Sequence, residues 1–214
     1  MCATVISTLY APPLGGVERG TMRDYNKISQ ELLSCYTKDH KFDEDTYILK
    51  RYFEKYRMIG WGLSRQVFNI GNGEVMKIAY ARGHQDGYTY GLACNYNEHL
   101  VYHSLSGELR EMFCPVSSVS KDGFFAVMKD AMRMKTGPLA DRLSIYSKFV
   151  QTALIMMEIH PGEIFDCEDN ILNGYIIDYG RVLVDNYILP KDAASKCTKA
   201  SYYYAQRTKE LQNV

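Results

Sequence analysis

The spacing of hydrophobic and polar positions changes along the chain. In the first quarter, apolar positions recur every three or four residues in two stretches, and Thr21 and Asp45 are placed to cap them. From residue 57 onward, short apolar runs alternate with turn residues, and Gly-Asn-Gly at 71–73 supplies the positive φ angles of a tight hairpin. These patterns predict an N-terminal helical extension over residues 1–56, followed by an antiparallel sheet.

The rest of the chain combines helices with a few more strands. The predicted elements are a helix over 92–105 that packs on the sheet and stops by Gly107, two strands around a Lys-Asp-Gly turn at 121–123, and a long helix over 139–157. A loop at His-Pro-Gly, a short strand, an acidic turn, a strand ending at Asp178 and a helix over 191–211 follow. The sequence therefore predicts an α+β fold, mainly β over 57–131 and mainly α over 132–214.

Composition and charge narrow the classes of partner. The chain has 214 residues, enough for a core without metal or disulfide staples, and 25 basic residues balance 25 acidic residues. Net charge therefore gives no attraction to nucleic acid or to an anionic membrane. The six cysteines form no Cys-x-x-Cys pair, and no stretch has the length and apolarity of a membrane span. We expect a cytoplasmic protein with reduced thiols and no membrane or direct nucleic-acid partner.

Two glycines one residue apart, Gly60 and Gly62, open the predicted sheet. Without Cβ atoms, their backbone N–H groups can approach phosphate oxygens closely. Because the glycines lead into a second strand instead of a helix, the dinucleotide-binding interpretation is disfavoured. An ordinary hairpin is the simpler explanation of a lone Gly-x-Gly pair. Arg65 stands where a third glycine would complete a phosphate-binding motif, and its cation is expected to contact phosphate or an acidic neighbour.

Lys77 and Glu98 form a second candidate feature. Strand alternation places Lys77 on the same face as Val75 and Ala79, where a half-buried ammonium needs an anionic partner. Glu98, on the next predicted helix, can supply that partner if the helix packs on the sheet. The alternative is that both side chains are solvated surface charges, which contribute little as a pair.

Six segments, taken in order, resemble the motifs of protein kinases. They are the glycine turn, the strand around Lys77, Glu98, Ala-Val-Met-Lys-Asp-Ala as a hinge, Glu-Ile-His-Pro-Gly-Glu-Ile, and Ile-Ile-Asp-Tyr-Gly. Over about residues 57–185 the pattern is most similar to the compact early serine/threonine protein kinases of short-tailed bacteriophages. The resemblance implies a two-lobed protein-kinase-like fold, with an antiparallel β N-lobe over 57–131 and a reduced, mainly α C-lobe with a C-terminal helix over 132–214.

The same resemblance implies a site for ATP and Mg²⁺. The glycine turn would cover the phosphates, Lys77 held by Glu98 would bind the α and β phosphates, and the hinge would receive the adenine. Asp178 would hold Mg²⁺, which prefers carboxylate and phosphate oxygens. The implied nucleotide-binding residues are Gly60, Gly62, Ser64, Arg65, Lys77, Met128 and Asp130.

Two residues depart from the kinase pattern. Glu158 stands at the position of the catalytic aspartate, and Glu163 stands at that of the metal-binding asparagine, close to His160, which would brace the catalytic loop. The extra methylene of a glutamate moves its carboxylate by about 1 Å, and a misplacement of that size can cost ~10²-fold in rate. A capped helix end and turn is the alternative explanation of this segment.

A second alignment of the catalytic loop is open. It uses Asp166 or Asp169 with Asn170 and makes Ile-Leu-Asn-Gly-Tyr-Ile a tight hairpin. The first alignment keeps His-Pro-Gly in place and leaves 20 residues between Glu158 and Asp178, near the interval of the family.

These expectations lead to rival functions. The first is a serine/threonine protein kinase that transfers the ATP γ-phosphate to hydroxyls of a host protein, with host transcription machinery as the target that the resemblance implies. The second is a catalytically impaired pseudokinase that inhibits a host protein by binding it, through the helical extension or the tyrosine-rich tail. That tail is open to two interpretations, because its tyrosines can form a partner surface or pack on the C-lobe. A third is a small-molecule kinase of the aminoglycoside type.

Overall fold

The computed structural model describes residues 23–37, 55–62, 64–79, 85–142, 147–166, 170–180 and 190–213. Its helices are α1 (Tyr25–Thr37), α3 (Gln85–Ser104), α4 (Gly107–Glu111), the 3-10 helix η1 (Ala131–Arg133), α5 (Leu139–Arg142), α6 (Ser147–Met156), α7 (Pro161–Phe165) and α8 (Pro190–Gln212). Its strands are β1 (Arg57–Trp61), β2 (Arg65–Gly71), β3 (Glu74–Ala79), β4 (Val116–Val119), β5 (Phe125–Lys129), β6 (Ile171–Leu172) and β7 (Tyr175–Ile176). The predicted caps at Thr21 and Asp45 lie outside the described residues.

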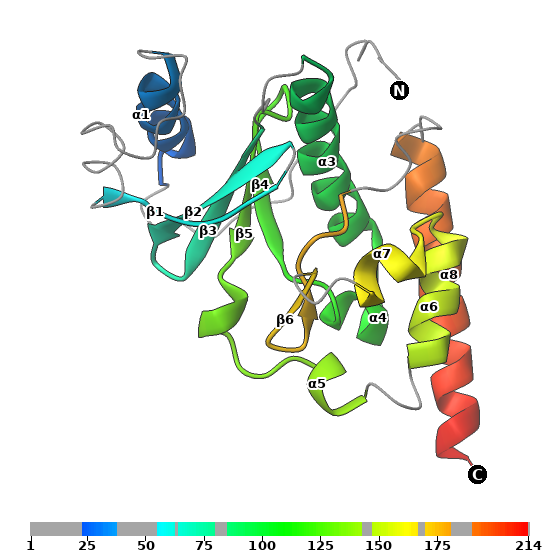
Figure 1. Ribbon diagram of the computed structural model, residues 1–214. Coiled ribbons are helices and arrows are strands. Elements are labelled where there is room, and N and C mark those ends of the chain that lie inside the picture. Colours follow the sequence, from blue (N-terminus) through cyan, green and yellow to red (C-terminus); the bar gives the residue numbers. More distant parts are fainter. Residues whose placement is uncertain are drawn as a thin grey trace.

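The five longer strands form one antiparallel sheet in the order β1-β2-β3-β5-β4 (Figure 1). The β2–β3 hairpin turns through Gly71, Asn72 and Gly73, with φ angles of 84°, 56° and 70°, which is the conformation that a tight turn of this kind requires. Helices α1 and α3 pack on the sheet. The predicted α+β class with an antiparallel sheet is therefore confirmed.

Strand β3 is buried along its whole length because helices cover both faces of the sheet. Met76 and Ile78 pack in one hydrophobic cluster with Ile28 of α1, whereas Val75 packs in a second cluster with Val101 of α3. Figure 1 shows α1 and α3 on opposite sides of the sheet. Each fully buried side chain of this size contributes roughly 1.5–3 kcal/mol of hydrophobic stabilisation. Part of the predicted N-terminal extension is thus built into the core.

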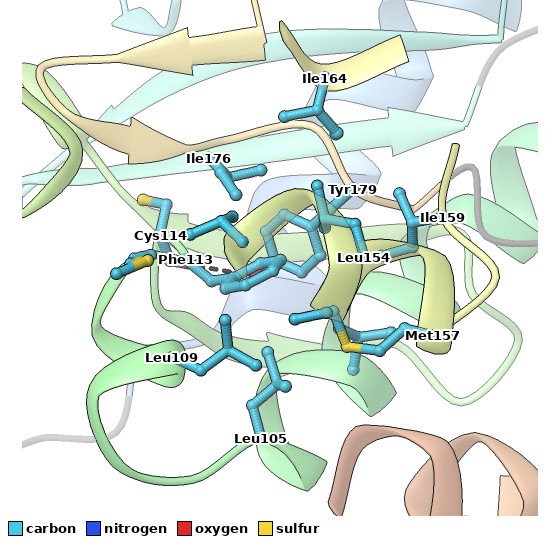
Figure 2. Packing of buried hydrophobic residues seen from close by; sticks show 14 of the residues in the cluster. Leu105, Leu109, Phe113, Cys114, Leu154, Met157, Ile159, Ile164, Ile176 and Tyr179 are labelled. Carbon is cyan, nitrogen blue, oxygen red and sulfur yellow. Dashed lines mark hydrogen bonds between the residues drawn. The ribbon is translucent and has the colours of Figure 1, made fainter. Parts of the chain in front are cut away.

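The second cluster joins the sheet to the helices of the C-terminal half (Figure 2). At its centre the ring of Phe113 meets the ring of Tyr179 edge to face, with centroids 5.0 Å apart, and the Tyr179 hydroxyl donates to the backbone O of Cys114 at 2.8 Å. Leu154 of α6 and Tyr204 of α8 are fully buried in the same cluster. This packing fixes the segment that follows β7 against α3.

Several predicted boundaries differ from the structure. The long helix expected over 139–157 corresponds to α5 and α6, and the residues between them lie outside the described part. The expected loop at His-Pro-Gly and the short strand expected after it are instead helix α7. Pro161 takes its first helical position, for which the fixed φ of proline is suited. Among the described helices, none has both the length and the apolar character needed to cross a membrane.

Candidate functional site

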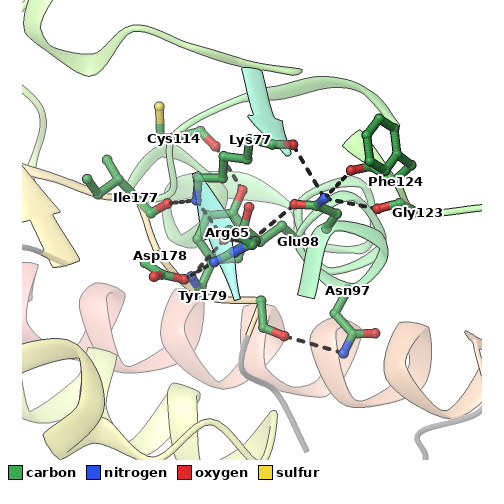
Figure 3. A network of polar contacts seen from close by, with 12 residues as sticks. Arg65, Lys77, Asn97, Glu98, Cys114, Gly123, Phe124, Ile177, Asp178 and Tyr179 are labelled. Carbon is green, nitrogen blue, oxygen red and sulfur yellow. Dashed lines mark hydrogen bonds and ion pairs between the residues drawn. The ribbon is translucent and has the colours of Figure 1, made fainter. Parts of the chain in front are cut away.

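Lys77 lies on β3 with its side chain buried on the α3 face of the sheet (Figure 3). Its Nζ lies 2.8 Å from Oε1 of Glu98, on α3, and donates to the backbone O of Ile177 at 2.5 Å. The predicted pairing of Lys77 with Glu98 is therefore present. These partners matter because an unpaired charge in a protein interior is costly. The contact with Ile177 also brings the ammonium next to Asp178.

Arg65, the first residue of β2, is the second cation of this cluster. Its buried guanidinium places Nη1 2.9 Å from Oε1 of Glu98, and Nη2 is ion-paired with Oδ1 of Asp178. Burial by itself would raise the pKa of Asp178, but the positive charges of Arg65 and Lys77 hold it well below its ordinary value. The sequence predicted one acidic neighbour or a phosphate for Arg65. The structure gives it two acidic neighbours.

Two glycines allow these elements to approach so closely. A Cβ on Gly91 of α3 would lie 2.3 Å from the backbone O of Ser64, and one on Gly180 would lie 2.3 Å from the backbone O of Cys94. Both distances are far below any ordinary contact, so each position accepts only a residue without a side chain. Gly91 brings α3 against the start of β2, and Gly180 brings the Asp178 segment against α3.

Asn95 is a buried residue of the site that the sequence reasoning missed. It lies one turn before Glu98 on α3, and its Nδ2 donates to the backbone O of Gly123 at 2.9 Å and of Phe124 at 3.1 Å. Its Oδ1 lies 3.5 Å from Nη1 of Arg65. Asn95 therefore ties α3 to the β4–β5 turn. The sequence did contain a signal for Asn95, namely a polar residue on a helix face that otherwise packs on the sheet.

The glycine turn is an ordinary hairpin connection in its backbone bonding. Gly60 lies at a bulge of β1, and the N–H of Gly62 donates to the backbone O of Arg65 at 2.8 Å. Ser64 is buried, whereas Trp61 is 65% exposed. The turn thus lies next to the charged cluster, because Arg65 belongs to both. The N–H of Gly62 is already hydrogen-bonded inside the hairpin.

The predicted hinge also makes many contacts within the protein. Met128 is buried in β5, and Asp130 caps η1 by accepting from the N–H of Met132 at 3.1 Å. The N–H of Asp130 donates to the backbone O of Gly73 at 2.8 Å, and the backbone O of Ala131 accepts from Nδ2 of Asn173 at 2.9 Å. The N–H of Asp130 is thus bonded to the β2–β3 turn, and the carbonyl of Ala131 to the β6–β7 hairpin.

Glu158 and His160 lie apart from the bonded cluster of Arg65 and Lys77. Glu158 has a left-handed backbone, with φ of 60°, and its carboxylate is ion-paired with Lys196 of α8. His160 precedes α7 with an exposed side chain, and no described hydrogen bond braces the loop through it. The side chain of Glu163, within α7, lies outside the described residues.

The tight hairpin that the second alignment of the catalytic loop expects is present in the structure. The segment from 171 to 176 forms the β6–β7 hairpin, with its turn at Asn173 and Gly174. Asp166 is exposed at the end of α7, Asp169 lies outside the described residues, and the backbone O of Asn170 accepts from the N–H of Ile177 at 2.9 Å. The hairpin is compatible with both alignments, because both place it between the loop and Asp178.

The acidic side chains of the cluster lie beside its two cations. Oδ1 of Asp178 holds the Arg65 guanidinium, and Oε1 of Glu98 faces both cations. Across the described ranges, no three His, Cys, Asp or Glu side chains are grouped so that they could hold a metal ion. Mg²⁺ is usually held by one or two carboxylates together with phosphate oxygens and water. Oε1 of Glu98 and Oδ1 of Asp178 contact the cations, whereas Oε2 of Glu98 is buried without a hydrogen-bond partner among the described residues.

A histidine pair on α3 predicts a specific pH dependence of stability. Nδ1 of His99 is buried with no hydrogen-bond partner among the described residues, and the ring centroids of His99 and His103 lie 4.3 Å apart. Burial, followed by the charge of His103, lowers the pKa of His99 to about 4. The folded state therefore keeps His99 neutral while the unfolded chain binds a proton near pH 6.5, so stability falls as the pH drops from about 6.5 to about 4.

Replacing His99 by leucine should remove this part of the acid sensitivity. We expect the His99→Leu variant to lose roughly 2 kcal/mol less stability than the wild type between about pH 7 and about pH 4.5, measured by urea unfolding. The exposed His160 provides a control, because His160→Gln should keep the wild-type acid sensitivity. Equal losses in His99→Leu and wild type would contradict the assignment.

The cluster as a whole joins two cations and two carboxylates from β2, β3, α3 and the segment after β7. Such fixed cations beside a strand turn suit the binding of phosphate oxygens, for which charge-assisted hydrogen bonds are strong. Comparison with models of known protein families and with curated proteins found no match.

Proposed function

We propose that this chain is an ATP-binding protein with a two-lobed, protein-kinase-like arrangement. The observation that carries the proposal is the position of Lys77, which is held by Glu98 and by the backbone O of Ile177, directly before Asp178. These residues come from a strand, a helix and a later segment 100 positions away from Lys77. The order β1-β2-β3-β5-β4 and the placement of α3 against the sheet support the same assignment.

The proposed activity is transfer of the ATP γ-phosphoryl group to a serine or threonine hydroxyl of a protein. Lys77 would bind phosphate oxygens, Glu98 would fix the position of the ammonium, and Glu158 would accept the hydroxyl proton once its carboxylate separates from Lys196. A host protein, with transcription machinery as the first candidate, is the acceptor that the bacteriophage resemblance favours. Mg²⁺ would be held by Asp178 together with phosphate oxygens, whose negative charge it would neutralise.

Two contacts favour a second candidate, a pseudokinase that binds nucleotide and a host protein without turnover. Glu158 is ion-paired with Lys196, and Asp178 is ion-paired with Arg65, so both acidic groups of the implied chemistry are engaged. The tyrosines of the C-terminal tail differ in their exposure to solvent. Tyr204 is buried, whereas Tyr202 is 66% exposed and is available to a partner.

Nucleotide binding is tested by thermal unfolding with and without ATP. Ligand at about 100 times its Kd stabilises a folded protein by roughly 2.7 kcal/mol, which for a chain of this size raises Tm by about 5–10 °C. The Lys77→Met variant should lose about tenfold or more in ATP affinity, because it lacks a charge-assisted contact. Lys148→Met, on an exposed position of α6, should bind like the wild type.

Phosphotransfer is tested separately with γ-labelled ATP and protein or small hydroxylated acceptors. Label on serine or threonine of a protein supports the kinase, and label on a small acceptor supports the aminoglycoside-type alternative. ATP binding without transfer supports the pseudokinase. A wild type that is folded but shows no stabilisation by ATP contradicts the nucleotide-binding proposal itself.

A further inference from the structure

Two imidazoles lie one helical turn apart on α3, outside the charged cluster. His99 and His103 are four positions apart, a spacing that places two side chains on one face of a helix. The same spacing holds zinc in helical His-Glu-x-x-His sites, although Leu100 stands here in place of the glutamate that acts as a base there. His99 is half-buried and His103 is exposed, so the pair is reachable from solvent through His103.

A hydrogen bond determines which nitrogen of His103 can bind a ligand. Its Nε2 lies 3.0 Å from the backbone O of Val116, the first residue of β4. Because a carbonyl oxygen only accepts, Nε2 carries the proton and the neutral ring keeps its lone pair on Nδ1. Histidines that bind metals usually have this arrangement, in which the other ring N–H donates to a backbone carbonyl or a carboxylate and orients the ring.

His99 has a ring nitrogen that the described part of the protein does not use. Its Nδ1 is buried and has no hydrogen-bond partner there. Buried polar atoms are nearly always hydrogen-bonded, and an exception requires a cause, of which an ion or a water molecule at that place is an ordinary one. A cation shared with His103 would give this nitrogen its partner.

The distance between the two rings suits a shared metal ion after a small adjustment. Zinc bonds imidazole nitrogen at about 2.0–2.1 Å, so two such ligands at angles of about 90–110° place their ring centroids roughly 4.6–5.3 Å apart. The observed centroids are 4.3 Å apart. The rings would have to separate by about 1 Å or less, which the exposed position of His103 permits. His103 also lies in the last turn of α3, where the helix dipole favours positive charge.

We propose that His99 and His103 form a two-histidine site for a borderline divalent metal ion of the zinc class, with water as its remaining ligands. Imidazole nitrogen suits zinc, copper and nickel, whereas Mg²⁺ prefers oxygen. No third His, Cys, Asp or Glu is grouped with the pair in the part of the chain that the structure describes, which is why the other positions fall to water. The site uses neither the charged cluster nor ATP, so it is independent of the proposed function.

Zinc binding is tested by nuclear magnetic resonance of the full ¹⁵N-labelled chain at about pH 7.5, where imidazole is mostly neutral. As ZnCl₂ is added, we expect the Nδ1 resonances of His99 and His103 to shift along one common binding curve, while those of the exposed His160 stay in place. MgCl₂ should move neither ring. If zinc moves neither ring or only one of the two, or if MgCl₂ has the same effect, the proposal is wrong.

His103→Gln tests the pair without altering the half-buried ring. The exposed glutamine keeps a donor for the Val116 carbonyl but lacks the ligand nitrogen. The zinc affinity read from His99 should therefore fall at least as far as the roughly tenfold that loss of an outer partner of a metal site costs. His160→Gln is the matched control and should bind zinc as the wild type does. Unchanged affinity in His103→Gln would overturn the proposal.

Arg110→Gln gives a result that a purely structural pair of histidines would not produce. The Arg110 guanidinium lies over the ring of Tyr102, 4.4 Å from its centroid, and its positive charge adds to the effect of burial in lowering the pKa of His103. The same charge repels a bound cation, so Arg110→Gln should tighten zinc binding by roughly two- to fivefold. Unchanged or weaker zinc binding by this variant, with its fold confirmed by circular dichroism, would contradict a cation beside His103.

Discussion

Replacing Glu98 by glutamine should destabilise the protein by about 3–5 kcal/mol, the usual cost of removing one partner from a buried ion pair. The Glu98 side chain is completely buried, and its Oε1 lies 2.9 Å from Nη1 of Arg65 and 2.8 Å from Nζ of Lys77. Glutamine keeps the shape of the side chain but removes its charge. Two buried cations would then share the single carboxylate of Asp178, which urea unfolding should register as a lower midpoint.

Matched variants separate the charge effect from a general effect of the substitution. Glu111→Gln, at an exposed position of α4, should change the stability by less than about 0.5 kcal/mol. The double variant Lys77→Met with Glu98→Gln should lose less than the sum of the single losses, because it removes both members of one pair. A loss below about 1 kcal/mol in Glu98→Gln would contradict the buried ion-pair network.

The sheet was largely predictable because its signals are local. Turn residues at 71–73 and 121–123 separate the strands, and alternation within β3 correctly placed Lys77 on the face of Val75, which is the face that meets α3. The prediction that Glu98 pairs with Lys77 also followed from this alternation together with a packed helix. The burial of both faces of β3 was not anticipated, since the contact with α1 depends on how a distant segment folds back.

The charged cluster was predictable only in part because its remaining contacts are long-range. Arg65 and Asp178 are 113 positions apart, and local sequence gives no sign of which acid a basic side chain will reach. The pairing of Glu158 with Lys196 of α8 was missed for the same reason. The α7 helix was missed because Pro161 was interpreted as part of a loop, although proline is favoured at the first position of a helix.

These long-range contacts depend on backbone approaches that a single methyl group would prevent. Gly180 follows Asp178 and Tyr179. A Cβ added at Gly180 would lie 2.3 Å from O, 2.8 Å from C and 2.9 Å from Cα of Cys94. All three atoms belong to the α3 backbone, which cannot move aside as the end of a flexible side chain can. The spacing between the Asp178 segment and α3, and with it the Arg65 contact, therefore requires glycine.

Gly180→Ala should accordingly cost about 3 kcal/mol of stability, at the upper end of the usual cost of overpacking, and should loosen the cluster as well. Gly60→Ala is the matched control: its added Cβ would lie 3.9 Å from the nearest atoms, of Val67, so its effect on stability should stay below about 1 kcal/mol. Chemical denaturation measures both.

The coupling energy between Arg65→Ala and Asp178→Asn, measured by a double-mutant cycle, should be smaller in the Gly180→Ala protein than in the wild type. The reason is that the added methyl group would push the segment around Asp178 away from α3. An unchanged coupling together with wild-type stability would show that α3 and this segment are not in close contact.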